Sequence, residues 1–273
     1  MNYETFQPTQ DLAAIVKCHW VLEIPYTPDT PKQRVIPDGC IEMCFILGDD
    51  VRRYQSETDF ILQPRAMVLG QITKPFFIQP TGDVKTFAVR FYPYGFANFI
   101  KQPISALADN ETPLSDLFDS ATADKLEVNI INVASTEERI ALVENFLLDE
   151  LKKQHTIDNI VKSTIETLTQ TKGNASILSM IKEDQTTRKS LERKFSAQVG
   201  VSPKQLGKII RLQAALKSML SGKEETLTQV AYENDYYDQS HFIRDFKEFT
   251  GTNPKDYFGN DQMILSSLIY SKD

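Results

Sequence analysis

The stretch that decides the fold is residues 240–246, SHFIRDF, near the end of a chain of 273 residues. An apolar residue, an arginine and a phenylalanine stand there at alternate positions, and residues 189–195, KSLERKF, show the same pattern 51 positions earlier. The same offset relates three further pairs of identical residues, which are Gly200 and Gly251, Pro203 and Pro254, and Lys204 and Lys255. A repeat of this length predicts a duplicated supersecondary unit.

Each copy of the repeat is predicted to contain a helix, a tight turn and a second helix. In the first copy, residues 176–181 are expected to form a short helix with an apolar face, followed by a polar turn at 183–186. Thr187 is the expected N-cap of the second helix, which runs to about Gln198 and ends before Gly200. This order is that of a helix-turn-helix unit, whose second helix enters the major groove of DNA.

The second copy has the same order, with a helix at 227–232, a turn at Asn234 and Asp235, and a second helix that starts near Asp238. A longer amphipathic helix from Pro203 to about Leu220 joins the two copies. Its length is roughly 27 Å at 1.5 Å per residue. Two recognition helices held in this way would enter successive major grooves, which lie about 34 Å apart on one face of the duplex.

The helical period separates the core residues of each recognition helix from its DNA-facing residues. Leu191 and Phe195 share one face, as do Phe242 and Phe246, and these faces are expected in the core. The outward residues expected to contact base edges are Lys189, Arg193, Gln239, Ser240 and Arg244. The residues expected to contact phosphates, which position the protein without specifying sequence, are Lys194, Lys204, His241, Lys247 and Lys255.

The charge distribution permits this interpretation. The whole chain carries a formal net charge of −7, but residues 160–258 hold 15 Lys and Arg against 12 Asp and Glu. DNA binding requires a local basic face, because affinity comes largely from neutralising phosphates and releasing counterions. The acidic remainder of the chain would limit non-specific adhesion to nucleic acid.

At these residues the sequence resembles the AraC/XylS family of bacterial transcription regulators. Residues 238–247, DQSHFIRDFK, are similar to the signature of that family, and residues 251–257, GTNPKDY, are similar to the segment that closes it. The first copy matches at Leu191, Arg193 and Phe195, at residues 200–203 and at residues 211–212. The resemblance covers about 100 residues. It implies a seven-helix DNA-binding domain in which the base-contacting residues named above enter the major groove.

The sequence departs from the family pattern at two places. Asp235 and Tyr236 stand where the family has Gly-Phe, and we expect Asp235 to adopt the left-handed conformation at some energetic cost. In the first copy, Ile181 and Gln185 replace a small residue and a glycine. This second departure predicts a distortion of the first helix-turn-helix unit.

The first hundred residues are predicted to be rich in β-strands. Runs of β-branched and aromatic residues alternate with turns such as Pro37-Asp38-Gly39, and they occupy residues 40–47, 66–69, 76–78 and 86–91. From about residue 94 to Lys153 the pattern becomes helical, and a linker is expected at 154–159. We therefore expect a β-rich sensor or dimerisation domain with a helical connector at 1–155, a DNA-binding domain at 160–258 and an apolar tail at 259–273.

Residues 1–150 also resemble the cupin-like N-terminal domain of some members of the family. The resemblance rests on Trp20 and on residues 37–40, 70–71 and 90–95. It implies a small β-barrel that senses an effector or mediates dimerisation and that can hold one small ligand. The residues expected to line the effector pocket are Trp20, Arg90, Tyr92 and Tyr94.

The apolar tail contains Met263, Ile264, Leu265, Leu268 and Ile269. An apolar segment of this kind is not stable when it is free in water. We expect it to dock on the N-terminal domain or on a partner chain.

No catalytic residue, metal site or cofactor is expected. Cys40 and Cys44 would share one face of a strand, but at 3.3 Å per residue they lie roughly 13 Å apart, too far to chelate one ion directly. With Cys18 they make three cysteines, an odd number that predicts reduced thiols. The chain has no run of eighteen apolar residues and no basic, apolar start, so we expect a cytoplasmic protein.

These patterns together predict an α+β protein, with an N-terminal β-barrel-like domain, a helical connector and an all-α double helix-turn-helix domain. The predicted function is that of a sequence-specific regulator of transcription that binds double-stranded DNA. We expect a homodimer that responds to a small-molecule effector and contacts RNA polymerase when it activates. Two alternatives remain open, namely an effector-free dimeric regulator with a filled barrel and an enzyme that its helical domain recruits to DNA.

Overall fold

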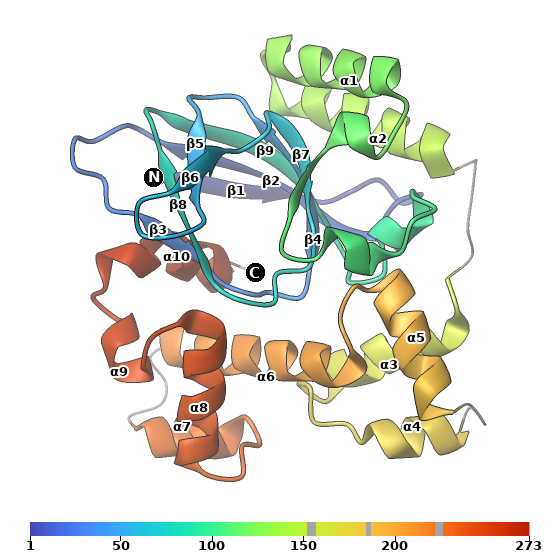
Figure 1. Ribbon diagram of the computed structural model, residues 1–273, viewed down its shortest axis with the longest axis vertical. Helices are drawn as coiled ribbons and strands as arrows, with labels where there is room; N and C mark the ends of the chain where they lie inside the picture. Colours follow the sequence, from blue (N-terminus) through green and yellow to red (C-terminus); the bar gives the residue numbers. More distant parts are fainter. Residues whose placement is uncertain (152–156, 184–186, 222–225, 273) are drawn as a thin grey trace.

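The computed structural model describes residues 1–151, 157–183, 187–221 and 226–272. The strands lie in the N-terminal part of the chain and helices make up the C-terminal part, so the α+β prediction is confirmed (Figure 1). Residues 154–156 of the expected linker and residues 184–186 of the expected first turn lie outside the described residues. None of the helices in the described ranges combines the length and the apolarity needed to cross a bilayer.

The N-terminal strands form two antiparallel sheets. The six-stranded sheet has the order β1 (Asn2–Phe6), β2 (Val16–Ile24), β9 (Val84–Phe91), β4 (Ile41–Ile46), β7 (Ala66–Leu69) and β10 (Glu111–Pro113). The four-stranded sheet has the order β3 (Gln33–Val35), β8 (Phe76–Pro80), β5 (Val51–Tyr54) and β6 (Phe60–Leu62). Apolar residues of both sheets, among them Leu22, Ile46 and Val51, share one buried cluster.

The sheets do not close into the barrel that the sequence predicts. The strands β1 and β10 remain at opposite edges of the larger sheet, and β3 and β6 remain at opposite edges of the smaller one. Closure of the larger sheet would require β10 to continue as a pairing strand. The chain instead leaves β10 at Pro113, which has no N–H for a ladder, and enters the short helix η3 (Leu114–Asp116). The N-terminal part is therefore a pair of open, packed sheets.

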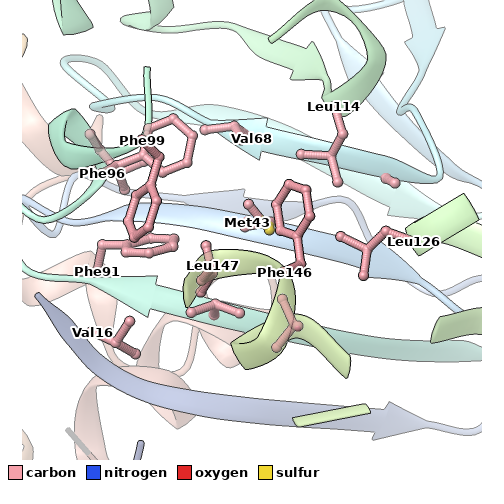
Figure 2. Packing of buried hydrophobic residues seen from close by; sticks show 14 of the residues in the cluster. Val16, Met43, Val68, Phe91, Phe96, Phe99, Leu114, Leu126, Phe146 and Leu147 are labelled. Atoms are coloured by element: carbon pink, nitrogen blue, oxygen red, sulfur yellow. The ribbon is translucent and has the colours of Figure 1, made fainter. Parts of the chain in front are cut away.

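Helices cover the other face of the larger sheet. The strand period of two directs Phe87, Val89 and Phe91 toward that face, where α1 (Ser120–Asn132) and α2 (Thr136–Leu151) pack. Figure 2 shows Phe91 beside Phe96 and Phe99, which belong to the segment that contains η1 (Phe96–Asn98). A further short helix, η2 (Ile104–Leu107), adds Ile104 and Leu107 to this cluster.

The C-terminal part consists of seven helices in the described residues up to Tyr257, the number that the family resemblance implies. They are α3 (Asn159–Gln170), α4 (Ile177–Glu183), α5 (Arg188–Gln198), α6 (Pro203–Leu220), α7 (Leu227–Glu233), α8 (Gln239–Thr250) and α9 (Pro254–Tyr257). The long helix α6 lies below the sheets and joins α4 and α5 at one end to α7 and α8 at the other (Figure 1). Its predicted bounds are confirmed.

The apolar tail docks on the N-terminal sheets. It forms η4 (Asp261–Met263) and α10 (Ile264–Lys272), which lies along β3. Leu265 is buried in the cluster between the sheets, and its N–H donates to the Gln33 side chain at 3.0 Å. The Ser266 hydroxyl donates to the carbonyl of Arg34 at 2.5 Å. The N-terminal domain, one of the two docking sites expected from the sequence, therefore holds the tail.

A second contact joins the N-terminal part to α6. The turn at Gly39 (φ +79°) lies so close to this helix that a Cβ there would stand 3.1 Å from Leu206. A side chain is disfavoured at Gly39 both by its left-handed backbone and by this approach. Beside it, the Gln213 amide donates to the carbonyl of Pro37 at 2.5 Å, and the Gln71 amide donates to the carbonyl of Gly39 at 2.9 Å.

A buried histidine makes the stability of the N-terminal part depend on pH. His19 on β2 is fully buried, and its Nε2 lies 2.9 Å from Oε1 of Glu144 on α2. Burial lowers the pKa of His19 below its ordinary value of 6.5, although the hydrogen bond and charge of Glu144 act in the opposite direction. The unfolded chain therefore takes up a proton at a pH at which folded His19 stays neutral.

We expect the stability that neutral His19 contributes to be fully present above about pH 6.5. As the pH falls below this value, the free energy of unfolding should decrease by up to about 1.4 kcal/mol per pH unit, until the pKa of His19 in the folded protein is reached. His19→Gln keeps an N–H toward Glu144 but does not titrate. Melting temperatures at about pH 7.5 and about pH 5.5 should therefore differ less for His19→Gln than for the wild type. An equal loss in both proteins would show that His19 does not carry this dependence.

Candidate nucleic-acid interface

The first helix-turn-helix unit is built around α5. The Thr187 side chain caps the helix by accepting from the N–H of Ser190, as the sequence predicts. Leu191 and Phe195 are fully buried in a cluster shared with α3, while Lys189 and Arg193 are exposed on the opposite side. Ile181 on α4 is 9% exposed and belongs to the same cluster. The aliphatic residue that departs from the family pattern is therefore part of the core of this unit.

The second unit has the same construction, with a side-chain cap at the start of both of its helices. A capping box at Thr226 and Gln229 starts α7, and the Asp238 carboxylate caps α8 by accepting from the N–H of His241 at 2.7 Å. Phe242 and Phe246 are fully buried, as predicted. The helix ends at Gly251 with a φ of 71°, the left-handed cap expected of glycine.

The turn of the second unit tolerates its missing glycine. Asp235 adopts a φ of 55°, which confirms the left-handed conformation expected there. Its carboxylate accepts from the Asn174 amide at 2.8 Å, and this bond ties the turn to the segment before α4. The neighbouring Tyr236 is buried, with its ring 5.2 Å from the Phe242 ring. Asp235 and Tyr236 therefore replace the Gly-Phe pair of the family pattern without loss of the turn.

An ion pair at the same repeat position fixes each recognition helix to its neighbour. Asp245 on α8 is fully buried, and its Oδ1 lies 3.1 Å from Nζ of Lys208 on α6. The equivalent residue of α5, 51 positions earlier, is Lys194, whose Nζ lies 2.9 Å from Asp158 at the start of α3. The charges are reversed between the copies, but the geometric role is the same.

The Lys208 ammonium also lies 2.9 Å from Glu248. Burial alone would lower the pKa of Lys208, but its hydrogen bonds to Glu248 and Asp245 outweigh burial and raise the pKa. Lys208 therefore stays charged and compensates the buried Asp245 carboxylate.

Comparison with known proteins shows to which kind of domain these two helix-turn-helix units belong. The family described as "Helix-turn-helix domain" matches residues 182–260, and the family described as "Domain of unknown function (DUF6597)" matches residues 4–113. The C-terminal part of the chain is an AraC-type helix-turn-helix domain. The protein is therefore a DNA-binding transcription regulator.

Comparison with curated proteins gives no match. Among solved structures, ToxT from Vibrio cholerae is similar over 94% of this chain and 98% of its own, with 13% identity and a TM-score of 0.48. ToxT from Vibrio cholerae O395 bound to (E)-4-(8-methylnaphthalen-1-yl)but-3-enoic acid covers the same shares, with 14% identity and a TM-score of 0.49. ToxT from Vibrio cholerae strain SCE256 bound to an unsaturated fatty acid is similar over 87% of this chain and 92% of its own, with 14% identity and a TM-score of 0.44.

The AraC-type domain presents most of its expected base-contacting residues to solvent. Lys189 and Arg193 on α5 are exposed, and so are Ser240 and Arg244 on α8. Gln239 is half-buried, and its Oε1 accepts from the Thr228 hydroxyl at 3.0 Å. The structure thus brings Gln239, Ser240 and Arg244 together on one helix, and Lys189 and Arg193 on the other.

The expected phosphate-contacting residues of the domain fall into two groups. Lys204, Lys247 and Lys255 are exposed. Lys194 is held by Asp158, and His241 is half-buried with its Nε2 3.6 Å from Oδ2 of Asp245. These last two side chains therefore have structural partners within the domain.

Sequence reasoning missed Tyr237, which is 87% exposed immediately before the cap of α8. With Asp238, Ser240, His241 and Arg244 it lines a shallow hollow at the start of the recognition helix. The exposure of Tyr237 could have been predicted from the sequence. This large aromatic residue stands beside the N-cap and outside the apolar pattern of the helix, so no core position is left for its side chain.

The N-terminal part contains a cavity of about 270 Å³ between its two sheets. Its walls are mainly apolar and include Leu22, Ile46, Met67, Ile78 and Val84, and Ile264 and Leu265 of α10 complete the lining. No lysine or arginine belongs to the described lining. A helix that follows the AraC-type domain thus forms part of the wall of a cavity in the N-terminal part.

The four residues expected to line an effector pocket are not in this cavity. Trp20 and Arg90 both donate to Oε1 of Glu42, at 3.1 Å and 2.6 Å, and Asp38 lies 3.8 Å from the Arg90 guanidinium. The hydrogen-bonding groups and charges of these side chains are thus paired with one another, as buried charges require.

Tyr92 and Tyr94, which were also expected to line the effector pocket, lie elsewhere. The Tyr94 ring stacks on the Tyr92 ring at 6.3 Å, and its hydroxyl donates to the carbonyl of Ala14. Tyr94 belongs to the buried cluster around α3 and α5. Tyr94 therefore joins the N-terminal part to the first helix-turn-helix unit.

The three cysteines form no disulfide in the described chain. Burial raises the pKa of both the Cys40 and the Cys44 thiols, so these two cysteines remain protonated. The described residues contain no group of three or more His, Cys, Asp or Glu side chains arranged to hold a metal ion.

The ion pair between Lys208 and Asp245 provides a test of how α8 is held. Lys208→Met leaves the buried Asp245 carboxylate without its ammonium partner, and we expect the free energy of unfolding to fall by about 3 kcal/mol. Adding Asp245→Asn should recover part of that loss by removing the buried charge. Lys204→Met, an exposed change on the same helix, is the control in urea unfolding followed by circular dichroism. Equal effects of Lys208→Met and Lys204→Met would contradict the role of the pair.

Proposed function

We propose that the protein recognises its operator with the outward faces of α5 and α8. Lys189 and Arg193 would contact base edges from the first helix, and Gln239, Ser240 and Arg244 from the second. The observation that carries this proposal is the equivalence of Arg193 and Arg244. Both stand at the same repeat position, and both are exposed beside buried aromatic anchors. Arginine binds guanine with two hydrogen bonds, which makes it suited to sequence-specific contacts.

The cations around these faces would position the domain on the phosphate backbone. Lys204, Lys247 and Lys255 are exposed and suited to this role. We assign weaker phosphate contacts to Lys194 and His241, because Asp158 and Asp245 already lie beside them.

The DNA contacts are tested by fluorescence anisotropy with the full chain and an operator selected from upstream genomic fragments. Arg244→Ala should weaken binding by about 1–3 kcal/mol and relax the base preference at one position. Lys247→Ala should weaken binding to all sequences and reduce the salt dependence between about 50 and about 200 mM salt. Lys125→Ala removes a cation on α1, outside both units, and is the control. Unchanged affinity of Arg244→Ala would overturn the docking.

We propose further that the cavity between the sheets is the effector site. Its support is its position, because a ligand there would touch both sheets and also Ile264 and Leu265 of α10. The same tail packs Met263 and Ile269 against the core of the second helix-turn-helix unit. A ligand with different affinity for the docked and undocked states of α10 would shift their populations and so alter operator binding. The apolar lining without lysine or arginine favours an uncharged, apolar molecule.

This cavity favours the effector-responsive regulator over the effector-free alternative with a filled barrel. As partners we propose double-stranded DNA, a small-molecule effector and a second copy of the chain, with RNA polymerase as a further partner where the protein activates. A bacterial cytoplasm is the location that fits these partners.

The effector site is tested with the neutral apolar fluorophore 1-aminoanthracene. Binding should raise its fluorescence and stabilise the wild-type chain in a thermal-shift experiment. Val84→Phe fills part of the cavity and should weaken probe binding at least about tenfold while the circular dichroism spectrum stays unchanged. Val128→Phe, an exposed change on α1, is the matched control. Equal probe binding by Val84→Phe and the wild type would place the probe outside the cavity.

A further inference from the structure

The smaller sheet has one covered edge and one apolar edge that the described chain leaves uncovered. At β3, α10 supplies the covering contacts to Gln33 and Arg34. The opposite edge is β6, whose three residues are all large, apolar and exposed: Phe60 is 44% exposed, Ile61 41% and Leu62 53%. Natural edge strands are normally kept short or are protected by charges, prolines or a covering element, because an open edge pairs readily with another chain. The strand β6 is short, but its three residues include no charge and no proline.

The hydrogen bonds of the hairpin define which backbone groups of β6 point outward. The N–H of Gln63 donates to the carbonyl of Val51, and the N–H of Gln55 donates to the carbonyl of Asp59. With Arg53 opposite Ile61, the residues that bond to β5 are therefore 59, 61 and 63. Phe60 and Leu62 consequently direct their N–H and C=O groups to the open edge.

We propose that β6 pairs antiparallel with β6 of a second copy of this chain, with the two-fold axis at Ile61. In this register Phe60 faces the partner's Leu62, and each such pair exchanges both of its backbone hydrogen bonds. Ile61 faces the partner's Ile61 on the other side of the extended sheet. All cross-strand pairs of the strand are then apolar, which is the arrangement that stabilises a sheet. The contact is isologous, as a closed dimer requires.

The outward backbone groups of β6 are symmetric about Ile61. Phe60 and Leu62, which carry these groups, stand one residue to either side of the proposed axis. The strand therefore complements its own copy in hydrogen bonding and in apolar side chains, which favours a second copy over an unrelated partner.

Pairing through β6 would hold together the homodimer proposed above, and this inference rests on the proposed function of the protein as a dimeric regulator. Three residues per chain bury less area than a permanent interface, so we expect a dimer that dissociates at low concentration and forms at about 100 µM. On an operator the second copy is held at a high effective concentration, and a weak contact is then sufficient for cooperative binding.

The register is tested by sedimentation velocity of the full chain. The wild type should form dimers at about 100 µM, whereas Ile61→Glu and Ile61→Lys alone should stay monomeric, because each sets like charges together at the axis. An equimolar mixture of the two variants should dimerise again, since residue 61 of one copy faces residue 61 of the other. Val128→Glu, at an exposed β-branched residue on α1, should dimerise like the wild type. A monomeric mixture, or a dimeric Ile61→Glu, would overturn the proposal.

A covalent test does not depend on the strength of the contact. A cysteine at the axis lies within disulfide distance of its copy, because Cα atoms of such a pair are about 4.5 Å apart. Ile61→Cys should therefore give a disulfide-linked dimer on mild oxidation, and Leu178→Cys, at an exposed position on α4, should not. Equal linking of both would contradict the register. Binding of Ile61→Glu to a half-operator separates this result from the DNA-binding proposal, since that binding should match the wild type.

Discussion

The arrangement of the whole molecule depends on the apolar contacts of one helix, α6. Leu206 belongs to the buried cluster of the first helix-turn-helix unit, and Ile209, Leu212 and Leu216 belong to that of the second. Ile36 of the N-terminal part is buried in the same second cluster, and the turn at Gly39 rests on Leu206 and Ile209. A single helix thus sets the spacing of the recognition helices and supports the N-terminal sheets (Figure 1). A tilt of α6 would therefore move both recognition helices relative to the N-terminal sheets that it supports.

The repeat carried most of the information about the C-terminal part. Buried Leu191, Phe195, Phe242 and Phe246, the caps at Thr187 and Asp238 and the left-handed Asp235 all follow from local rules of helix periodicity and capping. Such rules act over a few residues, so a single sequence is sufficient to apply them. The contacts of the exposed arginines with DNA are a different matter, because they depend on a partner and stay a proposal.

The relations that sequence reasoning missed are those between distant segments. Lys194 was expected at phosphates, but Asp158, 36 positions away, holds it. Trp20 and Arg90 were expected in a pocket, but Glu42 pairs with both. The cavity itself is formed by strands of two sheets and by α10, which follows the last of these strands by more than 170 residues. Sequence patterns identified β4, β7, β8 and β9, but not the other strands of the described residues. Such patterns do not specify which strands pair, and the domain expected to be barrel-like consists of two open sheets.

Two equivalent helices that read one face of a duplex should leave a defined pattern in the binding sites that the full chain selects from a random DNA pool. We expect two short clusters of fixed bases whose centres lie about 10.5 base pairs apart. Arg193→Ala should erase the preference in one cluster, and Arg244→Ala should erase it in the other. A single cluster, or two clusters that both change with the same arginine, would show that the two helices do not bind the duplex in this way.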